Sequence, residues 1–289
     1  MNIVVLGSSG QIGSAIKLLS NNKNKNKNFF YFLHRKKINY FNLNTLNSFL
    51  KKKKINVIIN CCAFTNVNEA TFKPNQALKV NFQFVKKLDN LCSLHKISLI
   101  HFSTDYVFNG KSKLPYGENF KTNPLNVYGK TKLLADNFLL KSKNKIVIIR
   151  TSWVFSYKSN SFVKKIIDKS KIQKEIEVVC DQIGCPTYSK DIAQTVVKIL
   201  DDKVLKKINK PLLFNFSNKN KTSWFEFARK ILKIVDSKSL AIPVKTIKIK
   251  NHTIRPKFSV LNTSKIEKFL NFNIRSWQRA LIECIEKKV

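Results

Sequence analysis

The chain has few acidic residues and very little arginine. Its 289 residues include 17 Asp and Glu against 54 Lys and Arg, a formal net charge of +37 at pH 7. Only six of the basic residues are Arg, the side chain best suited to forked contacts with phosphates and base edges. Lys, Ile, Phe and the 32 Asn share A/T-rich codons, so we attribute the charge to compositional drift. We expect weak, salt-sensitive polyanion binding but no specific nucleic-acid partner.

Zinc-type cysteine spacing and long apolar runs are also missing. The six cysteines form no C-x-x-C pair, and the adjacent Cys61 and Cys62 are predicted to be small buried hydrophobes. No stretch reaches about 18 apolar residues, and MNIVVLG is too short for a signal peptide. We therefore expect a cytoplasmic protein with reduced thiols and no membrane span.

Strand-like runs alternate with helical patterns in the first half of the chain. Buried strands are predicted at 2–6, 29–33, 57–60, 97–102 and 146–150, with a polar connector at 21–28. Helices are predicted from 13 to about 20, at 44–50, between the last three strands and at 130–140. This alternation predicts an α/β fold with a Rossmann-type, doubly wound parallel sheet.

The second half is less regular and predicts a smaller C-terminal α/β lobe. Helices are expected near 160–171, 189–201, 222–235 and 276–287, and strands near 176–180, 212–216 and 244–249. We therefore divide the chain into a dinucleotide-binding domain, 1–150, and a mainly substrate-binding lobe, 151–289, with some later strands returning to the sheet.

Three glycines follow the first predicted strand. In GSSGQIG, Gly7 would permit a tight turn, Gly10 a close backbone approach, and Gly13 close packing of the first helix on the sheet. The helix N-terminus would then face a pyrophosphate. The second strand ends in HRKK without a carboxylate, so Arg35 favours NADPH over NADH, although a solvated turn is the competing interpretation.

Two polar clusters suggest carbonyl reduction. Ser103, Thr104 and Asp105 follow the fourth strand, where open α/β sheets bind ligands. Tyr128 and Lys132 are four residues apart, so a helix would place them on one face, and the ammonium is expected to lower the phenol's pKa by about 2 to 3 pH units. A hydroxyl, a phenol and an ammonium together suit the protonation of an alkoxide formed by hydride transfer.

Further motifs give the chain a resemblance to a known family. They are STDYVF at 103–108, PLNVYGKTK at 124–132, RTSWVF at 150–155, DQIGCPT at 181–187, and Arg255-Pro256 before LNTSK at 261–265. The chain resembles the extended short-chain dehydrogenase/reductases, and within them the dTDP-4-dehydrorhamnose reductases. The resemblance implies an NADPH-dependent enzyme, with NADH as an alternative donor, that reduces the 4-keto group of a nucleotide sugar.

The resemblance also implies roles for individual residues. Tyr128 would be the general acid, Lys132 would tune it and grip the nicotinamide ribose, and Thr104 would position the substrate oxygen. Cofactor contacts are implied for Gly7, Gly10, Gln11, Ile12, Gly13, Cys62, Ala63, Thr65, Tyr128 and Lys132, and Asn42 stands where an Asp commonly approaches the adenine. Substrate contacts are implied for Val67, Thr104, Asp105, Tyr106, Tyr128, Trp153 and Arg255. Trp153 could equally be plain core, and Arg255 a solvated charge.

Some positions depart from the family pattern. Asn68 and Thr71 replace acids, and Ala15 and Lys190 stand where some members carry glutamates that bind Mg²⁺ at a dimer interface. We therefore predict no metal site, and a monomer or weak homodimer. The alternatives are a related nucleotide-sugar epimerase, dehydratase or reductase, a non-catalytic NADP-binding regulatory subunit, and a polyanion-binding protein. Dehydratases generally need an acidic pair beside the Tyr, whereas only Asp105 follows Thr104.

Overall fold

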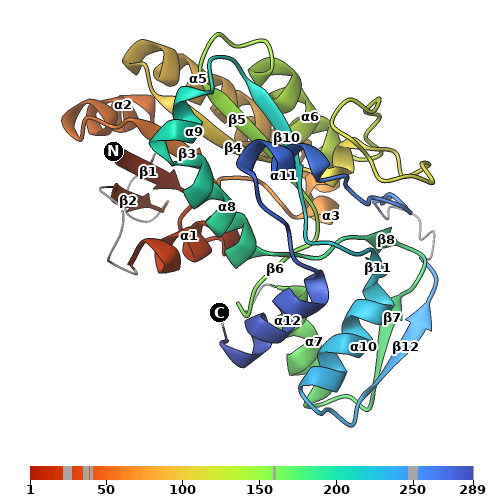
Figure 1. Ribbon diagram of the computed structural model, residues 1–289. Coiled ribbons are helices and arrows are strands. Elements are labelled where there is room, and N and C mark those ends of the chain that lie inside the picture. The colour runs from red at the N-terminus through yellow and green to blue at the C-terminus, as the bar shows by residue number, and fades with distance from the viewer. Residues whose placement is uncertain (22–27, 35–38, 40–41, 159–160, 247–252, 289) are drawn as a thin grey trace.

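A six-stranded parallel sheet forms the centre of the larger part of the molecule (Figure 1). The computed structural model describes residues 1–21, 28–34, 39, 42–158, 161–246 and 253–288. In spatial order the strands are β10 (Leu212–Phe216), β5 (Ile146–Thr151), β4 (Ser98–Thr104), β3 (Val57–Asn60), β1 (Asn2–Leu6) and β2 (Phe29–Leu33). Every neighbouring pair is parallel, which confirms the predicted Rossmann-type fold.

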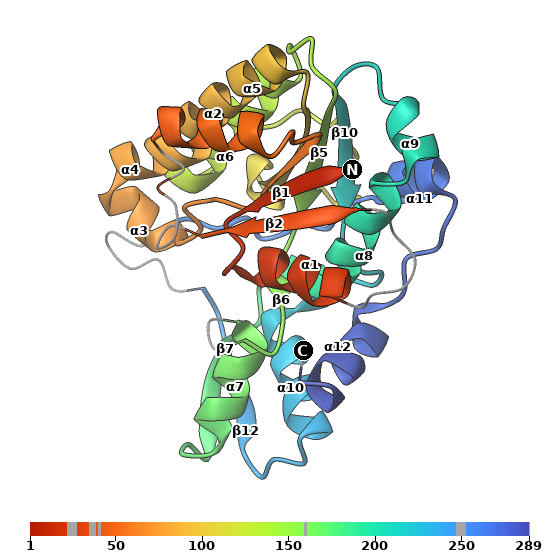
Figure 2. The ribbon, with the colours of Figure 1, turned by 90° about the vertical axis from the view of Figure 1, so that its left-hand side faces the viewer.

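Helices cover both faces of this sheet because successive strand side chains point to opposite sides (Figure 2). Val4 and Leu6 pack with one apolar cluster, and Ile3 and Val5 with the other. The first face is covered by α2 (Leu43–Lys52), α5 (Phe84–His95) and α6 (Val127–Leu139). The second is covered by α1 (Gln11–Asn21), α8 (Ser189–Ile199) and α11 (Ser264–Leu270), with α9 (Asp202–Lys206) following α8.

A smaller group of elements has its own apolar cluster and is seen below the sheet in Figures 1 and 2. It contains α7 (Phe162–Ser170), α10 (Trp224–Ile234), α12 (Trp277–Glu286), and the parallel pair β7 (Glu175–Val179) and β12 (Leu240–Val244). Two-residue strands link this group to the sheet: β6 (Val154–Phe155) with β9 (Thr187–Tyr188), and β8 (Ile183–Gly184) with β11 (Thr222–Ser223).

Several expected elements need correction. The strand expected near 244–249 is β12, which begins at Leu240 and ends at Val244, and residues 247–249 lie outside the described part, as does most of the connector 21–28. The helical pattern expected between the strands at 57–60 and 97–102 is divided into α3 (Val67–Phe72), α4 (Pro74–Leu78) and α5, whereas α9, α11 and the two-residue strands were not predicted. These elements are too short to show a periodic pattern. Strand β10, from the second half of the chain, pairs with β5 in the large sheet.

Candidate active site

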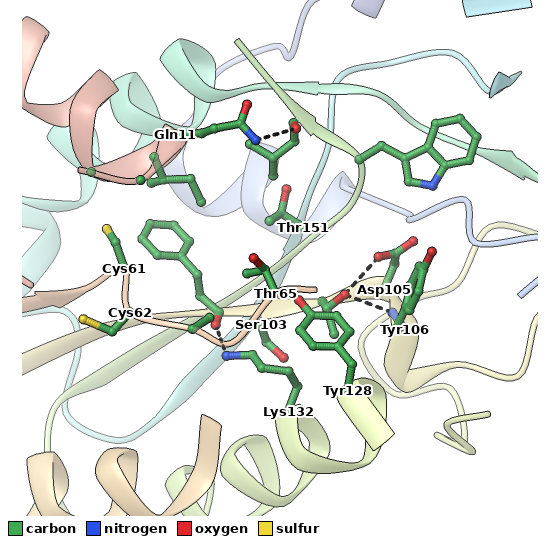
Figure 3. A pocket seen from close by; sticks show the side chains of 18 of the residues that line it. Gln11, Cys61, Cys62, Thr65, Ser103, Asp105, Tyr106, Tyr128, Lys132 and Thr151 are labelled. Carbon is green, nitrogen blue, oxygen red and sulfur yellow. Dashed lines mark hydrogen bonds between the residues drawn. The ribbon is translucent and has the colours of Figure 1, made fainter. Parts of the chain in front are cut away.

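A cavity of about 800 Å³, here called the main cavity, lies beyond the carboxyl ends of β1, β3, β4 and β5. Figure 3 shows side chains from these strand ends and from α6 facing one another across it. Of the predicted site residues, its walls include Gly10, Gln11, Ile12, Gly13, Cys62, Ala63, Thr65, Val67, Thr104, Asp105, Tyr106, Tyr128, Lys132 and Trp153. The tertiary structure therefore brings most of the predicted cofactor and substrate residues to one place.

The glycine turn forms one wall of the main cavity. Gly7 has φ +74°, and a Cβ atom there would lie 2.9 Å from the backbone of Cys61, so Gly7 supports the turn from below without lining the cavity. A Cβ on Gly13 would lie 2.6 Å from the Gly7 oxygen, which is why α1 can start against the turn. At Gly10 a Cβ would meet only one ordinary contact, 3.5 Å from the Gly7 oxygen, so space remains on the cavity side.

Helix α6 carries Tyr128 and Lys132 in its first two turns. It begins at Val127, three residues before the predicted start, because the Asn126 side chain accepts a hydrogen bond from the Gly129 N–H at 2.9 Å and caps the helix. Tyr128 and Lys132 both face the main cavity, as the four-residue spacing predicts (Figure 3).

The predicted lowering of the pKa of Tyr128 by Lys132 is wrong for this structure. Burial raises the pKa of Tyr128 to about 12, and its hydrogen bond with Thr104 opposes this rise without cancelling it. Nζ of Lys132 instead donates to the Phe102 carbonyl at 2.6 Å and lies 3.1 Å from Nε2 of the buried His101. Burial lowers the pKa of Lys132 to about 8. The spacing predicted the shared face correctly but could not show these competing partners.

Thr104 and Asp105 form a buried turn at the end of β4. The Thr104 hydroxyl donates to Oδ1 of Asp105 at 3.1 Å and accepts from the Tyr106 N–H at 3.2 Å. Burial raises the pKa of Asp105 to about 7, and its Oδ2 has no hydrogen-bond partner among the described residues. The rings of Tyr106 and Tyr128 pack edge to face with centroids 5.8 Å apart. This turn therefore sets hydroxyl and carboxyl oxygens beside the phenol of Tyr128.

Two stacked indoles form another part of the wall. Trp153 adopts a left-handed backbone conformation with φ +45°, and its ring lies parallel to that of Trp224, with centroids 3.6 Å apart. Gly184 makes this packing possible, since a Cβ there would lie 2.5 Å from the Trp153 ring. Trp153 is therefore a cavity residue and not plain core. Sequence reasoning did not find Trp224, which comes from the smaller group and carries no recognised motif.

Besides Gly7, two predicted residues with described positions, Asn42 and Arg255, do not line the main cavity. Asn42 instead caps α2, accepting from the N–H groups of Asn44 and Thr45 at 3.1 and 3.3 Å. Arg255 lines a second hollow of about 490 Å³, which shares Trp224 with the main cavity. Arg35 lies outside the described residues.

Asn68 and Thr71, the two residues after β3 that depart from the family pattern, both form hydrogen bonds. Oδ1 of Asn68 accepts a hydrogen bond from the Arg255 guanidinium at 3.4 Å. The hydroxyls of Thr71 and Thr253 are 2.8 Å apart and hydrogen-bonded. Since both contacts join α3 to the segment that begins at residue 253, neutral side chains here connect two parts of the chain beside the site.

Further polar residues that sequence reasoning missed support the site. Asn81 accepts from the Phe64 N–H at 2.8 Å and donates to the Thr131 hydroxyl at 3.1 Å, so it ties the loop after β3 to α6. It sits in a five-residue π-helical stretch, η1 (Lys79–Gln83), between α4 and α5. Lys158 lines the main cavity and donates to the Ser14 hydroxyl. Neither residue has a sequence pattern that marks it.

The positions associated with a metal in some relatives carry other interactions. Ala15 is buried on α1, and the Lys190 ammonium pairs with Glu283 on α12 at 2.5 Å. No cluster of three or more His, Cys, Asp or Glu side chains suited to a metal occurs in the described ranges. Within the same ranges, no helix combines the length and the apolar character needed to cross a bilayer.

The parallel sheet, the glycine turn and the Tyr128–Lys132 pair on one cavity define an oxidoreductase of the extended short-chain dehydrogenase/reductase type. Comparisons with known proteins narrow this class. Residues 1–289 match the family model described as RmlD substrate binding domain. The chain therefore belongs to the RmlD family, which includes the dTDP-4-dehydrorhamnose reductases, and the predicted resemblance is confirmed.

Individual relatives show how close the similarity is. A dTDP-4-dehydrorhamnose reductase from Aggregatibacter actinomycetemcomitans is 32% identical over 286 residues, 96% of each chain. A dTDP-4-keto-6-deoxy-D-glucose reductase from Streptomyces niveus is 30% identical over 78% of this chain and 77% of its own. The crystal structure of a dTDP-4-dehydrorhamnose reductase from Bacillus anthracis in complex with NADP superposes with a TM-score of 0.90, at 29% identity and 99% coverage of both chains.

Proposed function

We propose that this protein uses NADPH to reduce the 4-keto group of dTDP-4-dehydro-L-rhamnose to dTDP-L-rhamnose, the last step of dTDP-rhamnose synthesis. The observation that carries the proposal is the convergence of Thr104, Tyr128 and Lys132 on a cavity that the glycine turn also lines. Membership of the RmlD family supports the choice of a nucleotide-sugar 4-ketone as the substrate.

The glycine-turn wall fits a dinucleotide. Gly10 leaves space beside the N-terminus of α1, and backbone N–H groups at a helix N-terminus favour an anionic pyrophosphate. The loop after β3, with Cys62, Ala63 and Thr65, continues this wall toward Tyr128 and Lys132. We assign these residues, with Gln11, Ile12 and Gly13, to the cofactor, and Gly7 to the support of the turn.

Basic residues support NADPH as the preferred donor. The stretch that follows β2 reads HRKK, without the carboxylate that would hold the ribose hydroxyls of NADH. Lys158 adds a second basic group to the cavity wall, and the relative from Bacillus anthracis binds NADP. We therefore keep Arg35 as a contact for the extra phosphate, and NADH as the weaker donor.

Tyr128 supplies the proton. Because burial raises its pKa to about 12, the phenol is protonated at neutral pH and ready to donate. When bound, the nicotinamide supplies a hydride to the carbonyl carbon. Tyr128 then delivers its proton to the oxygen, the Thr104 hydroxyl turns from Asp105 to donate a hydrogen bond to that oxygen, and Lys132 offsets the charge left on the phenolate. General acid catalysis of this kind contributes a factor of about 10² to 10⁴ in rate.

The part of the main cavity away from the glycine turn suits the sugar nucleotide. The Trp153–Trp224 pair offers an apolar face to a sugar ring, and Asp105 and Tyr106 offer oxygens to its hydroxyl groups. Val67 closes the cavity on the side of α3. We assign Arg255, from the neighbouring hollow, to the diphosphate. The smaller C-terminal group would thus contribute most of the substrate lobe.

A second candidate reaction is reduction of a different 4-keto sugar nucleotide. The similarity to the Streptomyces niveus dTDP-4-keto-6-deoxy-D-glucose reductase favours it, since the two chains share 30% identity. The two reactions differ in the stereochemistry of the substrate and need the same Thr104, Tyr128 and Lys132 set. A non-catalytic NADP-binding subunit would have no need of that set.

The test is turnover of NADPH by the purified protein with each 4-keto sugar nucleotide offered separately. We expect turnover with dTDP-4-dehydro-L-rhamnose, its loss in Tyr128→Phe, and its retention in Tyr31→Phe, a matched substitution on β2 away from the main cavity. Faster turnover of dTDP-4-keto-6-deoxy-D-glucose would select the second reaction. Tight NADPH binding without turnover of either substrate would select the regulatory subunit.

A further inference from the structure

A chain of hydrogen bonds runs behind the main cavity from Lys132 into the sheet. Nζ of Lys132 lies 3.1 Å from Nε2 of His101, and Nδ1 of His101 lies 3.1 Å from Nδ2 of Asn60. Oδ1 of Asn60 then accepts the Cys62 N–H at 3.0 Å. Lys132, His101 and Asn60 are each at most 1% exposed, so water cannot easily replace any of these bonds.

The Cys62 N–H, at one end of this series, determines which atom donates in each of the other hydrogen bonds. A backbone N–H can only donate, so the atom of Asn60 that faces Cys62 is the carbonyl oxygen, and the amide nitrogen faces His101. That nitrogen donates to Nδ1, so a neutral imidazole must carry its proton on Nε2. The Nε2–H then points at Nζ of Lys132, which can accept only as a neutral amine, because an ammonium has no lone pair.

We propose that His101 and Asn60 are positioning residues that couple the charge of Lys132 to the tautomer of the buried imidazole. For Lys132 to become an ammonium, Nε2 gives its proton to Nζ and Nδ1 gains one proton from solvent. The Asn60 amide must then turn over so that its oxygen faces Nδ1–H, and the bond to the Cys62 N–H is lost. The hydrogen-bonded groups thus gain one proton in total. Because the Asn60 bond to Cys62 is lost in this change, the arrangement favours the neutral amine of Lys132.

Charged and titratable groups from three elements lie around Lys132. Its own helix contributes Tyr128 and Asp136, and the carboxylate of Asp136 is held by Arg150 of β5 at 2.9 Å. Cys62, after β3, and Asp136 both favour the charged lysine, whereas burial opposes it more strongly. Burial and Lys132 also keep the pKa of His101 well below its ordinary value, which agrees with a neutral ring.

The coupling matters for the proposed reduction, on which this part of the inference rests. After Tyr128 has given up its proton, the buried phenolate needs the positive charge of Lys132. Loss of the Lys132 proton at rising pH should therefore slow reduction. The Asn60–His101 pair sets the pH at which this occurs.

The direct test is the tautomer of His101, read from long-range ¹H–¹⁵N correlation spectra of ¹⁵N-histidine-labelled protein, with the signal assigned by its loss in His101→Gln. At about pH 9 the ring should carry its proton on Nε2, and it should change to Nδ1 as Lys132 gains its proton. Asn60→Asp should hold the proton on Nδ1 throughout, since a carboxylate can accept both from Cys62 and from the ring. Lys132→Met should abolish the change.

A matched control is Asn47→Asp, because the Asn47 side chain contacts His95 at 2.5 Å at a distance from the lysine. It should leave the His101 signals unchanged. A proton on Nδ1 in the wild-type protein at about pH 9, or a pH-dependent change of tautomer that persists in Lys132→Met, would overturn the inference even where Asn60→Asp does not fold.

The pH dependence of reductase activity provides an independent test. In Asn60→Asp the fall of kcat/KM at high pH should move up by about one pH unit, so that the ratio of high-pH to neutral-pH activity rises about tenfold. Absence of any reductase activity with the expected tautomers would refute the proposed function alone. An unmoved pH profile would instead show that the coupling does not govern Lys132.

Discussion

The contact between α6 and the turn after β4 predicts the outcome of Gly129→Ala. A Cβ atom at residue 129 would lie 2.2 Å from the Tyr106 carbonyl oxygen, more than 1 Å short of an ordinary contact, and 3.0 Å from the Pro124 side chain. The obstacle is backbone, so the start of α6 must move away from Tyr106. Because Tyr128 is the preceding residue, this movement would separate the phenol from Thr104.

The sign of the stability change is informative. In an exposed helix, Gly→Ala gains about 1 kcal/mol, whereas overpacking a buried site costs about 1 to 3 kcal/mol. We expect Gly129→Ala to lower the free energy of unfolding in urea by about 1 to 2 kcal/mol. A displacement near 1 Å should lower kcat about 10²-fold. The control is Lys130→Ala, on the exposed side of the same turn. A Gly129→Ala variant that is more stable and fully active would refute the packing argument.

Three other predictions follow from the burial or packing of single side chains. Asp136→Asn should cost about 3 to 5 kcal/mol of stability in urea unfolding, because it leaves the buried Arg150 without its counter-charge; a change below 1 kcal/mol would contradict this. Asp105 has a raised folded-state pKa of about 7, so its contribution to stability is present below about pH 4 and is lost as pH rises toward 7. Asp105→Asn should therefore gain stability relative to wild type at pH 8 but not at pH 4, measured as Tm, and equal differences at both pH values would argue against a raised pKa. Trp224→Leu removes the partner of Trp153 and about 1 kcal/mol of stacking, so KM for the sugar nucleotide should rise about fivefold while that for NADPH stays constant.

Several further expectations remain predictions. They are the cytoplasmic location, the monomer or weak homodimer, the absence of a specific nucleic-acid partner, and the division of the chain at residue 150. Gel filtration at varied protein concentration tests the second. Retention of DNA at low but not at physiological salt would agree with the third.

The sequence by itself determined the sheet and the identity of the central site residues. Each predicted strand of the sheet contains a short apolar run such as VIIN at 57–60, and strands buried on both faces produce such runs whatever the later contacts. The glycine turn and the Tyr128–Lys132 spacing are local constraints, so they could be read from neighbouring residues.

Only the tertiary structure decided which groups share the site and how they are charged. Trp224 reaches Trp153 from a distant part of the chain, and Asn42 turns out to cap a helix. The pKa of Tyr128 depends on burial and on partners such as Thr104. The contact of Lys132 with His101 joins a helix to a strand 31 residues earlier in the chain. Desolvation and long-range contacts exist only once the chain has folded, because no local spacing specifies them.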